Sequence, residues 1–405
     1  MTLLYESATT YNSDYTYYGV GSGVAPVLKV EMDLSSTFPT EVLDIDFGGV
    51  LAYDTSSEYD PADRYDGFVE FDDITSSARS LSINRGKSSL TYDHFDAGTC
   101  SIKLADFDST FLPDEPNSRF YPNITPLRQV RISAEWSGAT FVLFRGFVDN
   151  WDIRWQPKQQ YTEVTVTATD ATKLVANFDT TVTGVDYDTV ATRIQLMLTA
   201  VDWPADFTDL DTSSAFAYLL EDTADLRPML PNIQEYEVAE QGAFFVSKEG
   251  RITWRPQSVA YPGDGEDPLY GFSDTGLAGK VASTAIDYSV SDEAFYNTVD
   301  ITNSLGEQAA RSSASSIDEY RERSLVLTDV PLVSGGPNDV DALAIFILAR
   351  QSVPLARITA VSTDPRLNTH SALATVAGEL LQPIEITPET WTTQFNTDYR
   401  IDLIT

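Results

Sequence analysis

The sequence predicts a mainly β protein with an α/β segment inserted between two β-rich regions. In the first part of the 405-residue chain, short stretches that alternate apolar and polar residues follow one another, separated by turns. Apolar residues at helical spacing replace this alternation near residue 190, and alternating stretches return after residue 285. A high content of Thr, Ser, Val and Tyr, with only 4 Met, favours strands over helices. Many short strands separated by turns are typical of a sandwich or a barrel.

The first β-rich region follows a Tyr-, Ser-, Thr- and Gly-rich start. Residues 1–28 show little periodicity, and we interpret them as an N-terminal arm that orders on a neighbour or as a mobile tail. Residues 54–67 form a polar loop, and the turns Arg85-Gly86-Lys87 and Ser137-Gly138 separate later segments. The expected strands are Val27–Glu31, Phe68–Ile74, Ser80–Asn84, Gly98–Leu104, Val130–Trp136, Thr140–Asp149 and Tyr161–Thr169.

The middle of the chain has a different pattern. Apolar residues at Val190, Ile194 and Met197 predict a helix over 186–200, which ends before Pro204 because proline disfavours helical backbone in the residue that precedes it. A second helix is expected at 214–220. Further on, 243–247 and 252–254 predict a β-hairpin with its turn at Glu249-Gly250.

The last third returns to strands and contains one predicted helix. The helix covers 338–351 and is followed by Pro354. The strands expected here are Ala285–Val290, Asn297–Asn303, Ala356–Thr363 and Ile384–Ile386.

Charge and composition exclude several classes of function. The chain has 26 Lys+Arg against 61 Asp+Glu, a net charge of −35, which opposes nucleic-acid binding over the outer surface. The charge favours solubility, and it also suits a protein that lets DNA pass without adhering to it. One cysteine rules out an intrachain disulfide framework. No apolar run is long enough for a transmembrane helix, and the start lacks the features of a signal peptide, so we expect a protein made and kept in the cytosol.

Candidate catalytic residues are few. His94 and His370 are the only histidines and no HExxH motif occurs, which opposes a zinc peptidase or amidase. Cys100 lies six residues after His94, but its alternating strand makes a small core residue the simpler interpretation. None of the acid pairs has a context diagnostic of a glycosidase. We therefore predict no catalytic, metal or cofactor site.

Two acidic clusters and an aromatic arm leave alternatives open. The clusters could hold calcium, which takes oxygen ligands, although solvated acidic loops are the default interpretation. The tyrosines of the arm could stack on sugars or anchor in a partner, and the partner interpretation is preferred. The residues concerned are Asp60, Asp63 and Asp66; Asp264, Glu266 and Asp267; and Tyr11, Tyr15, Tyr17 and Tyr18.

Several segments resemble, in the same order, the minor tail proteins or baseplate hubs of siphoviruses, especially those of actinobacteria. Phe71-Asp-Asp-Ile-Thr75 with Ser82-Ile-Asn-Arg-Gly-Lys87 is similar to a W-x-D-V-T … RGR opening, with Phe71 replacing Trp and Lys87 replacing Arg. The resemblance covers roughly residues 65–365. It continues through Ala97-Gly-Thr-Cys-Ser-Ile-Lys-Leu-Ala-Asp106, Leu143-Phe-Arg-Gly-Phe-Val-Asp149, Glu240-Gln-Gly-Ala-Phe-Phe-Val-Ser247 and Asn297-Thr-Val-Asp-Ile301.

The resemblance implies two β-barrel hub domains, at 29–178 and 285–405, which flank an inserted α/β domain at 179–284. It implies a homotrimer whose six barrels continue the hexameric tail tube at the tail tip of the virion, assembled in the host cytoplasm. The partners it implies are a distal tail protein ring, the tape measure protein and other tail-tip proteins, with genome DNA passing through the lumen without specific binding.

Two other functions remain as alternatives. The chain could be the hexameric distal tail protein itself, which differs from the hub in subunit number. It could instead be a glycan- or receptor-binding tail protein, which predicts concave aromatic pockets that face away from the tube. An enzyme is the last alternative.

Overall fold

The computed structural model describes most of the chain between residues 25 and 404. The described residues are 25–34, 71–87, 94–156, 161–181, 184–212, 218–222, 225–260, 268–275, 279–290, 292, 295–333, 339–354, 356–387, 399–401 and 403–404. Within them the protein is mainly β, as predicted. No helix in these ranges is long and apolar enough to cross a membrane.

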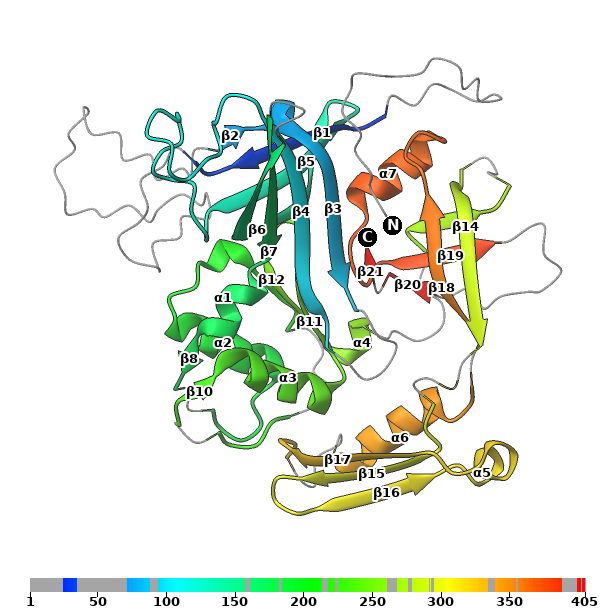
Figure 1. Cartoon of the computed structure of the whole chain (residues 1–405). Helices are drawn as coiled ribbons and strands as arrows, with labels where there is room; N and C mark the ends of the chain where they lie inside the picture. Colours follow the sequence, from blue (N-terminus) through cyan, green and yellow to red (C-terminus); the bar gives the residue numbers. More distant parts are fainter. Residues whose placement is uncertain are drawn as a thin grey trace.

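The largest element is an eight-stranded sheet that curves into a half-barrel (Figure 1). Its strand order is β2-β1-β5-β6-β7-β4-β3-β21, and every pairing in it is antiparallel. The strands are β1 (Val27–Met32), β2 (Asp72–Asp73), β3 (Ala78–Gly86), β4 (Asp96–Asp106), β5 (Gln129–Trp136), β6 (Ala139–Gln156), β7 (Tyr161–Thr169) and β21 (Leu403–Ile404). All seven strands predicted for this region overlap these elements; residues 68–70 of the second lie outside the described part.

The period-two alternation in the sequence explains why this sheet forms. In β7, every second residue from Thr162 to Ala168 is buried, and its neighbours are half-buried. Ile102 and Leu104 of β4 lie opposite Val166 and Val164, so their side chains share the buried face. Phe111, Phe120 and Ile124, from the segment between β4 and β5, cover this face and complete the core.

The turn between β5 and β6 agrees with its sequence. Ser137 and Gly138 both have positive φ angles, 52° and 82°. A two-residue hairpin with positive φ at both positions follows the right-handed twist of its strands. The predicted turn at Ser137-Gly138 is therefore confirmed.

Below the half-barrel in Figure 1 lies a mixed segment with three helices packed together. It contains α1 (Thr172–Asn177), β8 (Asp179–Thr180), α2 (Val190–Ala200), a 3-10 turn (Ala205–Phe207), β9 (Thr208–Leu210), β10 (Arg227–Pro228), α3 (Met229–Glu240), β11 (Ala243–Val246), β12 (Ile252–Arg255) and α4 (Gln257–Ala260). The predicted hairpin is confirmed, because β11 and β12 pair antiparallel.

One helix of this segment was predicted correctly and one was not. α2 begins after the N-cap residue Thr189, whose side-chain oxygen accepts the N–H of Thr192. The helix predicted over 186–200 therefore begins four residues later than expected, at Val190. Of the helix predicted at 214–220, only 218–220 are described. Leu219 there forms bridges to Asp188 and Leu332, so the backbone is extended and the prediction is wrong at these residues.

The last part of the chain forms two further sheets. A five-stranded sheet has the order β18-β14-β13-β19-β20, and a three-stranded sheet has the order β16-β15-β17. The elements are β13 (Tyr270–Ser273), β14 (Val281–Val290), β15 (Thr298–Asn303), β16 (Gln308–Ser312), α5 (Ala314–Tyr320), β17 (Ser324–Val330), α6 (Val340–Gln351), β18 (Ala356–Thr363), α7 (Thr369–Ala377), β19 (Pro383–Thr387) and β20 (Tyr399–Arg400). The helix predicted at 338–351 and all four strands predicted here are present.

The three-stranded sheet interrupts the five-stranded one along the chain. It lies between β14 and β18, which pair with each other despite the intervening residues, and α6 covers one of its faces. Val299 and Ile301 of this sheet and Ile347 of α6 join one core cluster with side chains of α2 and α3. The predicted boundaries of the arm, the two barrel domains and the inserted domain stay predictions.

Candidate assembly surfaces

The residues that the sequence offered for catalysis have different surroundings. Cys100 is 2% exposed, lies between Ile83 and Ala168 in the half-barrel core, and burial raises the pKa of its thiol. The interpretation of Cys100 as a core residue is confirmed. His94 instead contacts the α/β segment, with its Nδ1 2.8 Å from Glu237 Oε2. His370 is exposed on α7.

The two acidic clusters and the aromatic arm belong to segments outside the described residues. The residues concerned are Asp60, Asp63 and Asp66, the cluster at 264–267, and the tyrosines of the arm. Within the ranges that are described, no group of three or more His, Cys, Asp or Glu side chains is arranged to hold a metal ion.

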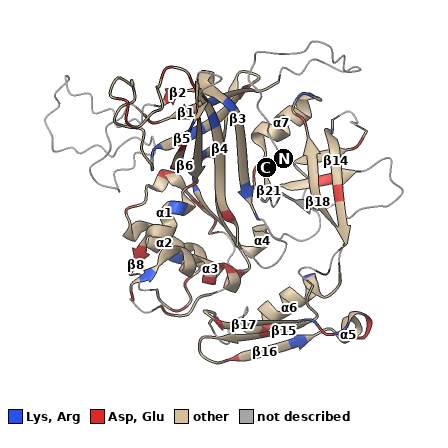
Figure 2. Ribbon diagram, viewed as in Figure 1, with Lys and Arg blue, Asp and Glu red and all other residues tan. Residues whose placement is uncertain are grey.

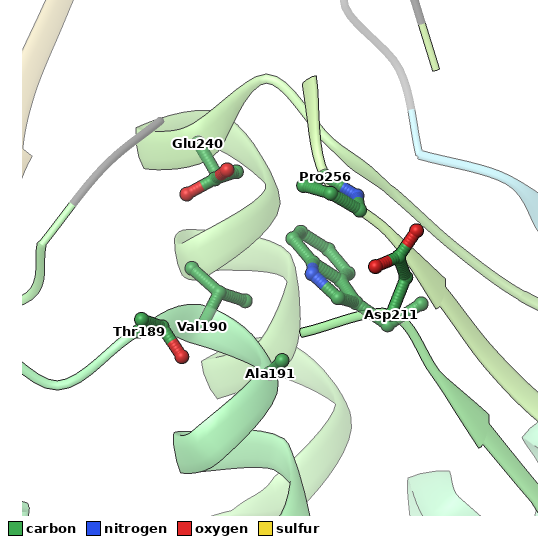
Figure 3. Close-up of a pocket in the computed structure, with 7 residues that line it drawn as sticks. Thr189, Val190, Ala191, Asp211, Glu240 and Pro256 are labelled. Carbon is green, nitrogen blue, oxygen red and sulfur yellow. The ribbon is translucent and has the colours of Figure 1, made fainter. Parts of the chain in front are cut away.

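A small cavity separates α2 from α3 and the end of β12 (Figure 3). Thr189, Val190 and Ala191 line one side, and Asp211, Glu240, Trp254 and Pro256 complete the wall. Its volume is about 10 Å³, which is room for one water molecule. Pockets that bind sugars or nucleotides are far larger, so this cavity does not bind an organic ligand in the conformation described.

A buried ionic cluster joins three parts of the molecule. Arg85 of β3 is 3% exposed and donates to the carbonyl of Val246 (2.8 Å) and to Glu379 Oε1 (2.7 Å). Lys248 donates its backbone N–H to Glu379 Oε2 and its Nζ to the Ala377 carbonyl at 2.8 Å. A cation at the last carbonyls of α7 also suits the helix dipole. The half-barrel, the β11–β12 hairpin and the end of α7 are therefore joined at one point.

A second buried cation fixes a surface loop. Arg193 of α2 is fully buried and donates to the carbonyls of Val185 (3.1 Å) and Leu220 (2.9 Å). A side chain at Gly184 would collide with its guanidinium, because a Cβ there would lie 1.8 Å from Cζ. The loop holds Tyr187 at a positive φ of 70°, a conformation that L-residues rarely adopt and that occurs preferentially at functional sites. Val185 and Tyr187 are 61% and 58% exposed on this hydrogen-bonded loop.

The half-barrel has two incompletely paired edges. On the side away from β5, the described part of the chain gives β1 a short pairing with β2 at Glu31 and Met32. Val30 also exchanges hydrogen bonds with Ile74 and Thr75 on this side. At the opposite edge, β3 pairs with β21 only at Arg85 and Gly86. The remaining residues of β1 and β3 have no second partner strand within the described part of the chain. Open edges of this kind pair readily with another chain unless they are covered.

Acidic and basic side chains are interspersed over the described elements (Figure 2). Many of the basic ones pair with acids, as Arg255 does with Asp209 and Arg227 with Asp222, each at 2.5 Å. Pairing of this kind leaves little positive charge to attract phosphates. The net charge of −35 arises because 61 Asp+Glu outnumber 26 Lys+Arg.

The chain is similar in fold to a solved prophage tail protein, and weaker likenesses to other tail proteins are found. The 43 kDa tail protein of prophage MuSo2 from Shewanella oneidensis superposes with a TM-score of 0.51 at 10% identity, covering 82% of this chain and 88% of that one. A tail protein from Neisseria meningitidis MC58 follows, with a TM-score of 0.49 at 8% identity and coverage of 80% and 88%. Prophage tail protein gp18 from Listeria monocytogenes has a TM-score of 0.45 at 9% identity and coverage of 82% and 86%.

No protein-family model and no curated protein sequence matches the chain. At 10% identity the likeness to the Shewanella protein concerns the fold, and it extends over most of both chains. This chain has the fold of a prophage tail protein.

Proposed function

We propose that this protein is a structural, non-enzymatic component of the tail tip of a long-tailed bacteriophage, where it acts as a homotrimeric baseplate hub. The observation that carries the proposal is the open half-barrel with two incompletely paired edges. The likeness in fold to a prophage tail protein over 82% of the chain supports a role in a tail. The ordered motifs of the sequence favour the hub among the tail components.

In this role the protein acts by assembling with other copies of itself and with other tail proteins. Edges of neighbouring half-barrels would pair and form a closed ring that continues the tail tube, and ring closure would cover strands that otherwise aggregate. A distal tail protein ring would lie above the hub, and the tape measure protein and other tip proteins would complete its contacts.

The excess of acidic residues gives the ring a function in DNA delivery. Fixed negative charge on the surface facing the tube keeps DNA from adhering as it passes. We expect the tube-facing surface of the assembled particle to be mainly acidic. A lumen lined with Lys and Arg would contradict this expectation.

Imaging of intact virions with the symmetry of the tip determined tests the proposal. Three copies of this chain at the end of the tube are expected. Six copies in a ring above the tip would instead identify it as the distal tail protein, and its absence from virions would refute both roles.

The loop that Arg193 holds, with exposed Val185 and Tyr187, favours one alternative, a surface that binds receptors or host glycans. Exposed aromatic residues on a fixed loop bind sugars and proteins at a low entropic cost. Binding of the purified protein to cell-wall glycans, lost in Tyr187→Ala, would support it. The same incubation, examined for released fragments, tests for enzymatic activity, and none is expected.

A further inference from the structure

Two short segments near the end of the chain lie against the end of β3. The first is 379–382, which follows α7, and the second contains Ile401, Leu403 and Ile404. The two segments are hydrogen-bonded to each other, because the N–H of Leu381 donates to the Ile401 carbonyl at 2.8 Å. We call these residues the C-terminal flap.

A carboxylate attaches the flap to the half-barrel and to the β11–β12 hairpin. Glu379 accepts hydrogen bonds from Arg85 Nη2 at 2.7 Å and from the backbone N–H of Lys248 at 2.9 Å. The desolvation of a buried ion pair offsets much of its attraction, and both ions regain their hydration when the pair separates. An ionic attachment of this kind can therefore open at a lower cost than the contact geometry alone suggests.

The apolar contacts of the flap belong to a small core of their own. Within the described part of the chain this core has six buried residues, among them Leu380 and Leu381 of the flap and Phe95 and Phe245 outside it. The half-barrel core, by contrast, has 23 buried residues. Regions with few buried apolar contacts open at a lower free energy than large cores unfold. The flap can therefore detach while the half-barrel stays folded.

The backbone of the flap contains a strained residue and begins at a hinge. Leu381 has a φ of 63°, a left-handed conformation that is unfavourable for a bulky side chain and can relax when the flap opens. Gly378 ends α7 and separates it from the flap, and Val376 of α7 is buried in the half-barrel core. At the other boundary, Pro383 pairs with Arg400 in the five-stranded sheet. Both neighbouring elements can therefore keep their places while the flap moves.

We propose that the C-terminal flap is a conformational switch that opens independently of the main cores, with the contacts of Glu379 to Arg85 and Lys248 as its latch. In the closed state β21 covers the last two residues of β3, and opening removes this cover. The flap thereby regulates one of the two incompletely paired edges of the half-barrel. Only the use of that edge for assembly rests on the proposed hub.

Thiol labelling of the purified full-length chain measures the opening. Leu380→Cys places a thiol in the flap, where the native side chain is 4% exposed. Cys100 is the only native cysteine and is 2% exposed in the half-barrel core, so its labelling reports unfolding of that core. Ala243→Cys in the same small core is the second probe if Leu380→Cys does not fold. Iodoacetamide is the reagent, and mass spectrometry of the peptides gives the rate at each thiol.

The thiol introduced at position 380 is expected to react at least about 10-fold faster than Cys100. Glu379→Gln in the same background should raise the rate in the flap about 10-fold, because it removes the carboxylate that binds the buried charge of Arg85. The rate at Cys100 should not change. The matched control is Glu249→Gln, which removes a carboxylate from an exposed pair on the same hairpin as Lys248 and should change neither rate.

Three results would overturn the proposal. The first is a thiol in the flap that reacts no faster than Cys100, since the flap would then open only when the core unfolds. The second is an unchanged rate in the flap of Glu379→Gln, and the third is a rise by the same factor at both thiols. None of them bears on the copy number in virions, which tests the hub separately.

Discussion

The half-barrel and the five-stranded sheet differ in how completely their own chain buries them. In β7 of the half-barrel, buried residues alternate regularly with half-buried ones, whereas in β14 only Val281 is buried. The half-barrel core is extended by Phe111, Phe120 and Ile124, which come from the segment between β4 and β5. The core cluster at the five-stranded sheet contains five buried residues. The first sheet therefore buries more apolar side chains than the second within the described part of the chain.

The largest expected effect is on the free energy of unfolding, and it differs between substitutions in the two cores. Ile102→Ala in β4 should lower the free energy of unfolding by about 3–4 kcal/mol, because a fully buried side chain leaves a cavity. Ile286→Ala in β14 should cost less than about 1.5 kcal/mol in the monomer, because Ile286 is only half-buried. Urea unfolding followed by tryptophan fluorescence measures both. Equal losses would show that the two sheets are equally buried in solution.

Asp170, which directly follows β7 of the half-barrel, has a carboxyl group with a raised pKa. Asp170 accepts N–H groups from Gly98 and Thr172, and burial raises the pKa of its carboxyl from 3.8 to about 6. Its contribution to stability is fully present below pH 3.8 and is lost as the pH rises through about 6. The total loss is on the order of 3 kcal/mol.

Asp170→Asn should remove this part of the pH dependence between pH 4 and 7. The test is the difference in unfolding free energy between the wild type and the variant, measured at several pH values. A difference that does not vary with pH would contradict the assignment.

A smaller effect is expected at the buried ionic cluster that joins the half-barrel, the β11–β12 hairpin and the end of α7. Lys248→Met removes the cation at the end of α7 but keeps the backbone N–H that Glu379 accepts. The expected loss is about 1–2 kcal/mol, with faster hydrogen exchange in the last turn of α7. The matched control is Arg251→Met, whose exposed pair with Glu249 should contribute less than about 0.5 kcal/mol.

The smallest effect concerns the five-stranded sheet and has the opposite sign to that of Asp170. The hydrogen bond from Lys280 lowers the pKa of Glu385, so its contribution is present above pH 4.5 and is lost as the pH falls through the folded-state value. Lys280→Met should raise the pKa of Glu385 towards 4.5, which an NMR titration of the carboxyl measures. An unchanged pKa would show that the ion pair is absent in solution.

Much of the secondary structure was predictable because its signals are local. Alternation identified the strands of the half-barrel, and helical spacing identified α2 and α6. α3 was missed, because Pro231 lies within it and two of its buried positions are Glu237 and Glu240, which breaks the apolar pattern. The pairing of β14 with β18 was also unpredictable, since a complete three-stranded sheet separates them in the sequence.

The candidate surfaces were only partly visible in the sequence. The predicted strand ended at Asp149, although Trp151, Ile153 and Trp155 continue the alternation, and that signal could have extended it. Arg193 could have been noticed as a cation on the apolar side of α2. Neither observation shows which surface is open, because this depends on segments that are distant in the chain.

The sequence by itself determined the β-rich composition, the order of most elements, the core position of Cys100 and the large negative charge. These features follow from residue type and from periodicity over a few residues. Only the tertiary structure decided that the largest sheet is an open half-barrel, that the three-stranded sheet interrupts the last one, and that Trp155 and Val290 stay exposed. The physical reason is that exposure is set by what remote segments cover, and contacts between remote segments leave no local pattern in the sequence.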